Sequence, residues 1–146
     1  MGILVNPIAG MGGSVGLKGT DGKETLDEAV RRGAVRIAGA RMAAALASAD
    51  LSGSAILTCG GEMGSLALRQ LGLTAEIVYE PNDPTTPQDT VSGARRLLQA
   101  LVDIILFAGG DGTANDLMGA IDESVPVLGV PAGVKMHSAV FANSPR

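Results

Sequence analysis

An acidic residue lies inside a glycine-rich stretch, Gly109-Gly110-Asp111-Gly112-Thr113, that directly follows an apolar segment. Glycines at such a place let a phosphate approach the backbone, and the helix expected after them presents unpaired N–H groups to the same space. A carboxylate beside a phosphate is tolerated if it holds a magnesium ion or accepts a proton from an attacking hydroxyl. The pattern therefore indicates phosphoryl transfer, with Asp111 activating a hydroxyl directly or through Mg²⁺.

An Asp-Gly pair also occurs in ordinary turns and helix caps. In that alternative, Asp111 caps the helix and Gly112 takes a left-handed backbone conformation. The two glycines before Asp111 favour a ligand-binding role, because a cap does not need a bare backbone on its strand side. Both interpretations stay open at this point.

A second glycine-rich stretch covers residues 6–22 and holds six glycines in seventeen positions. It lacks the Walker pattern, since its Gly-Lys pair is followed by Glu24, and it lacks the G-x-G-x-x-G spacing of dinucleotide-binding folds. The stretch is either a flexible surface loop or a loop that folds over a ligand. In the second case its polar groups are Lys18, Thr20 and Asp21.

Short apolar runs bounded by Gly or Pro alternate with helical segments along the chain. The runs are too short for helices and lack polar alternation, as expected of strands buried on both faces. These predicted strands are 2–5, 54–58, 75–79, 103–107 and 125–130. The predicted helices are 34–48, 64–71, 87–100, 113–121 and one that begins near Ser138.

The alternation predicts an α/β fold with an open, mostly parallel, Rossmann-like sheet and helices on both faces. The helix over 87–100 is the best marked, because Thr86 can cap it, Pro87 suits its first position and Asp89 favours its dipole. Ligands in such sheets bind beyond the carboxyl ends of the strands, where the glycine-rich stretches are expected to lie.

Composition narrows the class of protein. The 146 residues fit one domain, and 15 acidic against 11 basic residues give a net charge of -4, which disfavours a nucleic-acid or anionic-membrane partner. Cys59 is the only cysteine and is expected in the core, while His137 is the only histidine. No apolar run approaches the roughly 18 residues of a membrane span. We therefore expect a cytoplasmic protein without a membrane partner.

Four sequence blocks together resemble one family. They are NPIAGMGGSVGLKGTDG at 6–22, TTPQDT at 85–90, FAGGDGTAND at 107–116 and GVPAGVKMHSAVFA at 129–142. The chain is similar to the ATP-NAD kinase family, which includes NAD kinases and the acetoin-catabolism X proteins. The resemblance implies transfer of a phosphoryl group from ATP or polyphosphate to the 2′-hydroxyl of NAD, giving NADP, with Mg²⁺ or another divalent cation.

The resemblance also implies roles for individual residues. Asp111 corresponds to the base for the NAD hydroxyl, while the metal ligands are not identified. The residues implied in nucleotide binding are Asn6, Gly109, Gly110, Gly112, Thr113, Gly133, Lys135 and His137. Among them Lys135 is suited to neutralise charge on the donor phosphates.

Members of the family normally continue into a β-rich domain that closes over the nucleotide, and we expect residues 1–146 to form the amino-terminal domain without it. Two further functions remain open: a kinase for a lipid or sugar hydroxyl, and a nucleotide-binding or regulatory module without catalysis. The expected partners are small nucleotides, and self-association into a homo-oligomer is possible for a domain that lacks its usual cover.

Overall fold

A computed structural model describes residues 1–20, 22–121, 124–134 and 136–142 of the chain. Within these residues, five strands form one sheet in the order β3-β2-β1-β4-β5, and every neighbouring pair is parallel. The strands are β1 (Gly2–Val5), β2 (Leu57–Cys59), β3 (Glu76–Tyr79), β4 (Ile105–Gly109) and β5 (Val127–Pro131). Each predicted strand is present.

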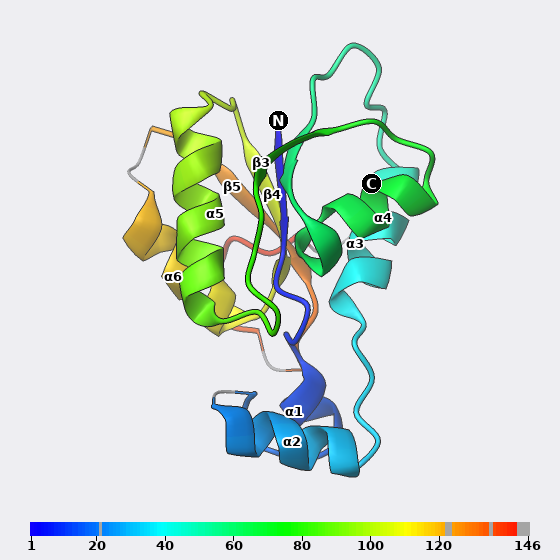
Figure 1. Ribbon diagram of the computed structural model, residues 1–146, viewed down its shortest axis with the longest axis vertical. Helices are drawn as coiled ribbons and strands as arrows, with labels where there is room; N and C mark the ends of the chain where they lie inside the picture. Colours follow the sequence, from blue (N-terminus) through cyan, green and yellow to red (C-terminus); the bar gives the residue numbers. More distant parts are fainter. Residues whose placement is uncertain (21, 122–123, 135, 143–146) are drawn as a thin grey trace.

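Helices cover both faces of the sheet, so the predicted α/β class is confirmed (Figure 1). One face packs against α3 (Ala38–Ala47) and α4 (Ser65–Gln70), and the other against α5 (Pro87–Gln99) and α6 (Asp111–Ala120). A short 3-10 turn, η1 (Gly61–Met63), leads into α4.

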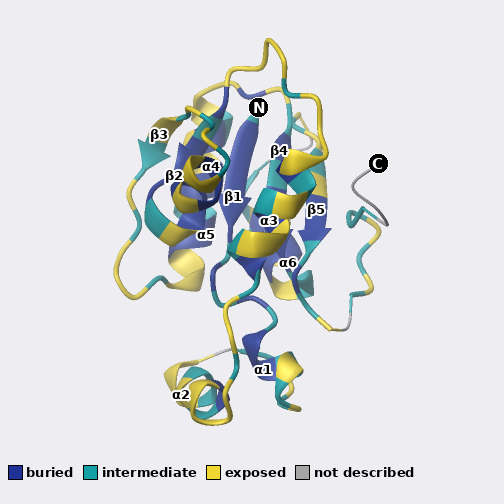
Figure 2. Cartoon of the chain, turned by 90° about the vertical axis from the view of Figure 1, so that its right-hand side faces the viewer, coloured by how far each residue is buried: buried dark blue, intermediate teal, exposed yellow. Residues whose placement is uncertain are grey.

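The central strand β1 shows why its sequence is apolar throughout. Ile3 is buried in the same cluster as Met42 of α3, whereas its neighbour Leu4 is buried on the opposite face with Leu97 of α5. A strand between two helical layers has no solvent side, and successive side chains enter different cores. Figure 2 shows β1 buried along its length between more exposed helices.

Pairing with β1 sets the strand bounds. Its first residue, Gly2, pairs with Leu57 of β2 and Ile105 of β4. These strands therefore begin at residues 57 and 105, later than the predicted 54 and 103, because hydrogen-bonded pairing rather than apolar character decides where a strand starts. The helix predicted from residue 34 likewise begins at Ala38, and the preceding Arg36 forms an ion pair with Glu62.

Two helices lie in the amino-terminal part of the chain, where no helix was predicted. They are α1 (Met11–Ser14) and α2 (Lys23–Arg31), and both lie beyond the carboxyl ends of the strands (Figures 1 and 2). The helical spacing of Leu26, Ala29 and Val30 was the available signal for α2. Its burial is slight, since Ala29 is buried but Val30 is 57% exposed.

The prediction of a helix that begins near Ser138 is wrong for residues 138–142, where the described part of the chain ends. The Gly129 N–H donates to the Val140 carbonyl at 2.7 Å, and the Ala142 N–H donates to the Gly129 carbonyl at 2.9 Å. This segment thus pairs with the outer edge of β5. The Phe141 ring packs 5.5 Å from the Phe107 ring, and Gly129 leaves the space for it.

A buried carboxylate organises the connection from β3 to α5. Asp89 is fully buried and accepts hydrogen bonds from the Tyr79 hydroxyl, the backbone and side-chain N–H groups of Asn82, and the backbone N–H and hydroxyl of Thr86. The bond from the Thr86 N–H is one half of a capping box at the start of α5. These donors hold the pKa of Asp89 far below its usual range, against the effect of burial, which opposes the charge.

Candidate functional site

The sheet has a topological switch point between β1 and β4. The chain leaves β1 toward β2 on one side, whereas β4 and β5 lie on the other side. Crossovers that depart in opposite directions open a crevice at the carboxyl ends of these strands, and ligands of open α/β sheets bind there. The residues that follow β1 and β4 therefore form the candidate site.

Asn6 connects the two strands at this point. Its backbone N–H donates to the Ala108 carbonyl at 2.9 Å, and its side-chain Nδ2 donates to Thr113 Oγ1 at 2.9 Å. Its Oδ1 accepts the N–H of Ile8 at 3.3 Å. Asn6 thus joins the end of β1 to the first turn of α6.

The loop after β5 packs against both of these segments. The Ala132 N–H donates to the Gly109 carbonyl at 2.9 Å. Gly10 has a positive φ of 80°, and a Cβ added there would lie 1.8 Å from the Ala132 carbonyl oxygen. A Cβ added at Gly133 would lie 3.8 Å from the Cα of Gly110. The approach at Gly10 requires a residue without a side chain, and the loops of β1, β4 and β5 meet closely.

The first turn of α6 presents backbone N–H groups at the switch point. Gly110 is the N-cap residue in an extended conformation, and its own N–H contacts Thr113 Oγ1 at 3.4 Å. The helix begins at Asp111, so the N–H groups of residues 111–113 have no carbonyl partner within the helix. The left-handed conformation considered for Gly112 is wrong, because Gly112 lies inside the helix and is not among the residues with positive φ.

The carboxylate of Asp111 bonds to the segment after β5. Its Oδ2 accepts the backbone N–H of His137 at 2.9 Å, and its Oδ1 accepts the backbone N–H of Ser138 at 3.1 Å and the Ser138 hydroxyl at 2.8 Å. The side chain makes no capping bond to its own helix, so the capping alternative is wrong. The His137 and Ser138 donors lower the pKa of Asp111, because they stabilise the anion.

The structure brings most of the predicted site residues into one region. Asp111 accepts the backbone N–H of His137, and His137 is exposed. Gly109 packs directly against Thr113, because a Cβ added at Gly109 would lie 2.5 Å from the Thr113 Cβ. The predicted residues that lie around the switch point are Asn6, Gly109, Gly110, Asp111, Gly112, Thr113, Gly133 and His137. Lys135 lies outside the described residues, as does Asp21 of the stretch 6–22.

The glycine-rich stretch over residues 6–22 makes hydrogen bonds within itself. Thr20 Oγ1 accepts the Gly12 N–H at 3.0 Å, and the Leu17 N–H donates to the Gly12 carbonyl at 2.8 Å. A Cβ at Gly13 would lie 2.5 Å from Val134, so α1 contacts the loop after β5. Thr20 is thus engaged within the stretch, whereas Lys18 is exposed.

Ser138 lies at the candidate site, bonded to Asp111, and was not among the predicted site residues. Its contact with Asp111 spans 27 positions, and no local spacing encodes such a distance. Its place in the block after β5, which the family resemblance had already linked to the nucleotide, was the only available signal.

The described residues do not by themselves form a site for a divalent cation. No group of three or more His, Cys, Asp or Glu side chains within them could hold a metal ion. The carboxylate at the switch point is already bonded to three N–H and O–H donors. In sites for phosphate transfer, Mg²⁺ is commonly held by one or two carboxylates together with phosphate oxygens.

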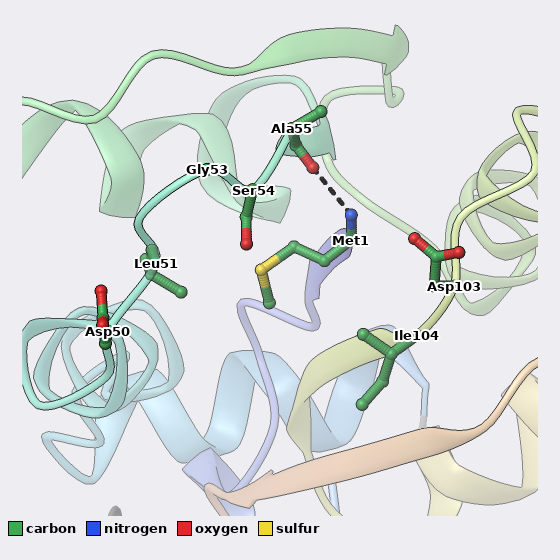
Figure 3. Close-up of a pocket in the computed structure, with 8 residues that line it drawn as sticks. All are labelled: Met1, Asp50, Leu51, Gly53, Ser54, Ala55, Asp103 and Ile104. Atoms are coloured by element: carbon green, nitrogen blue, oxygen red, sulfur yellow. Dashed lines mark hydrogen bonds between the residues drawn. The ribbon is translucent and has the colours of Figure 1, made fainter.

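A separate hollow of about 580 Å³ lies at the amino-terminal edge of the sheet (Figure 3). It is lined by residues that precede β1, β2 and β4, among them Met1, Ser54 and Asp103, and the Met1 amine donates to the Ala55 carbonyl at 2.7 Å. None of the predicted site residues lines it. Because ligands of parallel α/β sheets bind at the carboxyl edge, this hollow is not the candidate site.

An open parallel sheet with helices on both faces, and glycine-rich loops at its switch point, places the protein in the Rossmann-like α/β class. Residues 1–146 match the family described as the ATP-NAD kinase N-terminal domain, and the chain belongs to this family. Comparison with curated proteins and with solved structures gives no match. No helix within the described ranges has the length and apolar character needed to cross a bilayer.

Proposed function

We propose that the protein is a phosphotransferase that moves a phosphoryl group from ATP or polyphosphate to the 2′-hydroxyl of NAD, giving NADP. One observation carries the proposal: in a member of the ATP-NAD kinase family, the Asp111 carboxylate lies at the start of α6, at the switch point between β1 and β4. A phosphate-binding helix start and a carboxylate that can accept a proton are both needed for this reaction.

In this proposal, the first turn of α6 binds phosphate and Asp111 accepts a proton. The N–H groups of residues 111–113 and the dipole of α6 bind phosphate oxygens, and the side-chain bond from Asn6 to Thr113 keeps that turn against β1. As the NAD oxygen forms its bond to phosphorus, the terminal P–O bond of the donor breaks, and Asp111 accepts the proton of the hydroxyl. The lowered pKa of Asp111 makes it a weak base, which suffices where the transition state is loose and the proton moves late.

The first prediction tests Asp111 by assay of NADP from NAD with either donor. Asp111→Asn is expected to lower the rate by about 100-fold or more, because a positioned general base contributes on that scale. Asp50→Asn is the control, since Asp50 lies at the opposite edge of the sheet and lines the hollow there. Retention of full activity by Asp111→Asn would contradict the proposal. Phosphorylation of a lipid analogue or a sugar instead of NAD would assign another acceptor.

A non-catalytic nucleotide-binding module is the second candidate. The observation that favours it is the engagement of Asp111 with three donors of residues 137 and 138. Calorimetric titration with NAD and ATP separates the two candidates. Binding of nucleotide without NADP formation from either donor would support the module, whereas turnover that depends on Asp111 supports the kinase.

A further inference from the structure

We propose that Ser138 is the positioning residue for Asp111. Its hydroxyl, together with the backbone N–H groups of residues 137 and 138, orients the carboxylate and leaves one acceptor position of Oδ2 for the alcohol that reacts. The assignment of that open position to a reacting alcohol rests on the proposed function. The positioning itself rests on the hydrogen bonds.

The bonds to the carboxylate are unequal between its two oxygens. Oδ1 accepts two hydrogen bonds, both from Ser138, at 3.1 Å from the backbone and 2.8 Å from the hydroxyl. Oδ2 accepts one, from the His137 N–H at 2.9 Å. A carboxylate offers about four lone-pair positions. With the donors of the described residues in place, Oδ1 is saturated and Oδ2 keeps one position, so the oxygen that can take a proton is defined.

Both sides of this contact are anchored in the sheet. Asp111 follows β4 through Gly110 and is the first residue of α6. The segment that carries Ser138 is tied to β5, because Gly129 exchanges backbone hydrogen bonds with Val140 and Ala142 at 2.7 and 2.9 Å. The carboxylate is therefore oriented from a neighbouring strand and not by a free loop, which is the support that a reacting group needs.

Among the three donors to Asp111, only the Ser138 hydroxyl belongs to a side chain, so a substitution can remove it without removing the backbone donors. Any residue other than proline at positions 137 and 138 supplies the backbone N–H groups, whereas a short side-chain hydroxyl at 138 requires Ser or Thr. Ser138→Ala removes that donor alone, and Ser138→Thr keeps it. The pair of variants thus separates the hydroxyl from the backbone contacts.

The experiment follows the carboxyl ¹³C signal of Asp111 and the amide signals of residues 137 and 138 by NMR across an acid titration of the full chain. In the unchanged protein, both amides should report the same midpoint as the Asp111 carboxyl, because they donate to it. Ser138→Ala should raise that midpoint, and Ser138→Thr should restore it. In the NADP assay, Ser138→Ala should lower kcat by roughly 10- to 100-fold with little change in KM, as expected for a misoriented reacting group.

A matched control is the Asp50–Ser52 pair, which lies at the opposite edge of the sheet. Asp50 Oδ1 accepts the backbone N–H and the hydroxyl of Ser52, at 3.0 and 2.5 Å, and these bonds lower the pKa of Asp50. Ser52→Ala should raise the midpoint of Asp50 while leaving that of Asp111 and NADP formation unchanged. The control shows what losing a serine hydroxyl does to a carboxylate outside the site.

The outcomes separate this inference from the proposed function. An Asp111 midpoint and residue 137 and 138 amide signals that are unchanged in a folded Ser138→Ala variant would overturn the positioning role, whatever the activity. A loss of kcat that Ser138→Thr does not restore would also overturn it. If the unchanged chain forms no NADP but its Asp111 responds to Ser138→Ala as expected, the proposed function fails and the positioning of the carboxylate is upheld.

Discussion

Two aspartates show how surroundings give the same side chain different uses. Asp89 is fully buried and accepts five hydrogen bonds, so no acceptor position is left for a ligand. Asp111 is partly exposed and accepts three from the described residues. The pKa of each is lowered by its donors. Burial and donor number therefore mark Asp89 as structural, whereas Asp111 is the more accessible of the two carboxylates.

The structural role of Asp89 predicts a pH dependence of stability. A carboxyl whose pKa is lowered in the folded state stabilises the protein at pH values above its usual pKa of 3.8, and this contribution is lost as the pH falls below that value. Asp89→Asn replaces one acceptor oxygen with an NH₂ group, which faces donors and cannot accept their hydrogen bonds. The free energy of unfolding at pH 7 should therefore fall by roughly 1–3 kcal/mol. Urea unfolding from pH 7 to pH 3 should show a smaller loss of stability for the variant on acidification. Parallel curves for the two proteins would contradict this role.

At the scale of elements, the close approach of β4 and α6 depends on a missing side chain. Gly109→Ala would place a Cβ 2.5 Å from Thr113 and press on the residue that Asn6 holds. We expect a destabilisation of about 1–3 kcal/mol by overpacking, together with weaker nucleotide binding. Gly119→Ala in α6 is the control, because a Cβ added at Gly119 meets nothing within 4 Å. This variant should raise the free energy of unfolding by up to about 1 kcal/mol. Thermal unfolding of both variants measures the difference, and equal effects would contradict the packing argument.

Sequence predicts the elements of this protein better than their ends. The central strand β1 is recognisable because both of its faces are buried, which leaves the continuous apolar run 2–5, whereas the edge strand β3 is partly exposed. The bounds of the strands depend on register with β1, and register is a property of pairs of segments. α2 escaped prediction because its apolar face is short, and the expected helix at Ser138 is overruled by pairing with Gly129. A tertiary contact decides the structure in that last case.

The candidate site shows the same contrast between local sequence signals and tertiary contacts. The position of Asp111 at the carboxyl edge follows from a strand, two glycines and a helix in sequence, all of which are local signals. Its hydrogen-bond partners at 137 and 138 belong to a different strand connection. Local patterns can place a reactive group in a fold, but they do not show which distant residue orients it.

At the scale of the whole molecule, α1 and α2 form an outlying part beside the carboxyl edge of the sheet (Figure 2). Only Ala29 of α2 is buried, whereas α5 has five buried residues. Few buried contacts mean that a segment opens at low free energy. Amide hydrogens of α2 should therefore exchange with deuterium well before those of α5 under native conditions. Similar exchange rates in the two helices would contradict this view of the stability distribution.

The strand order also governs how the protein can fold. Gly2 of β1 pairs with Ile105 of β4, so the centre of the sheet joins positions separated by 103 residues. Closing so long a stretch of chain is slow compared with forming local helices, and most of the polypeptide must exist before the closure can happen. The switch point between these two strands does not form until β4 has paired with β1. A chain interrupted before β4 would contain both partners of the β1–β2 pairing but would lack the switch point at which we propose that nucleotide binds.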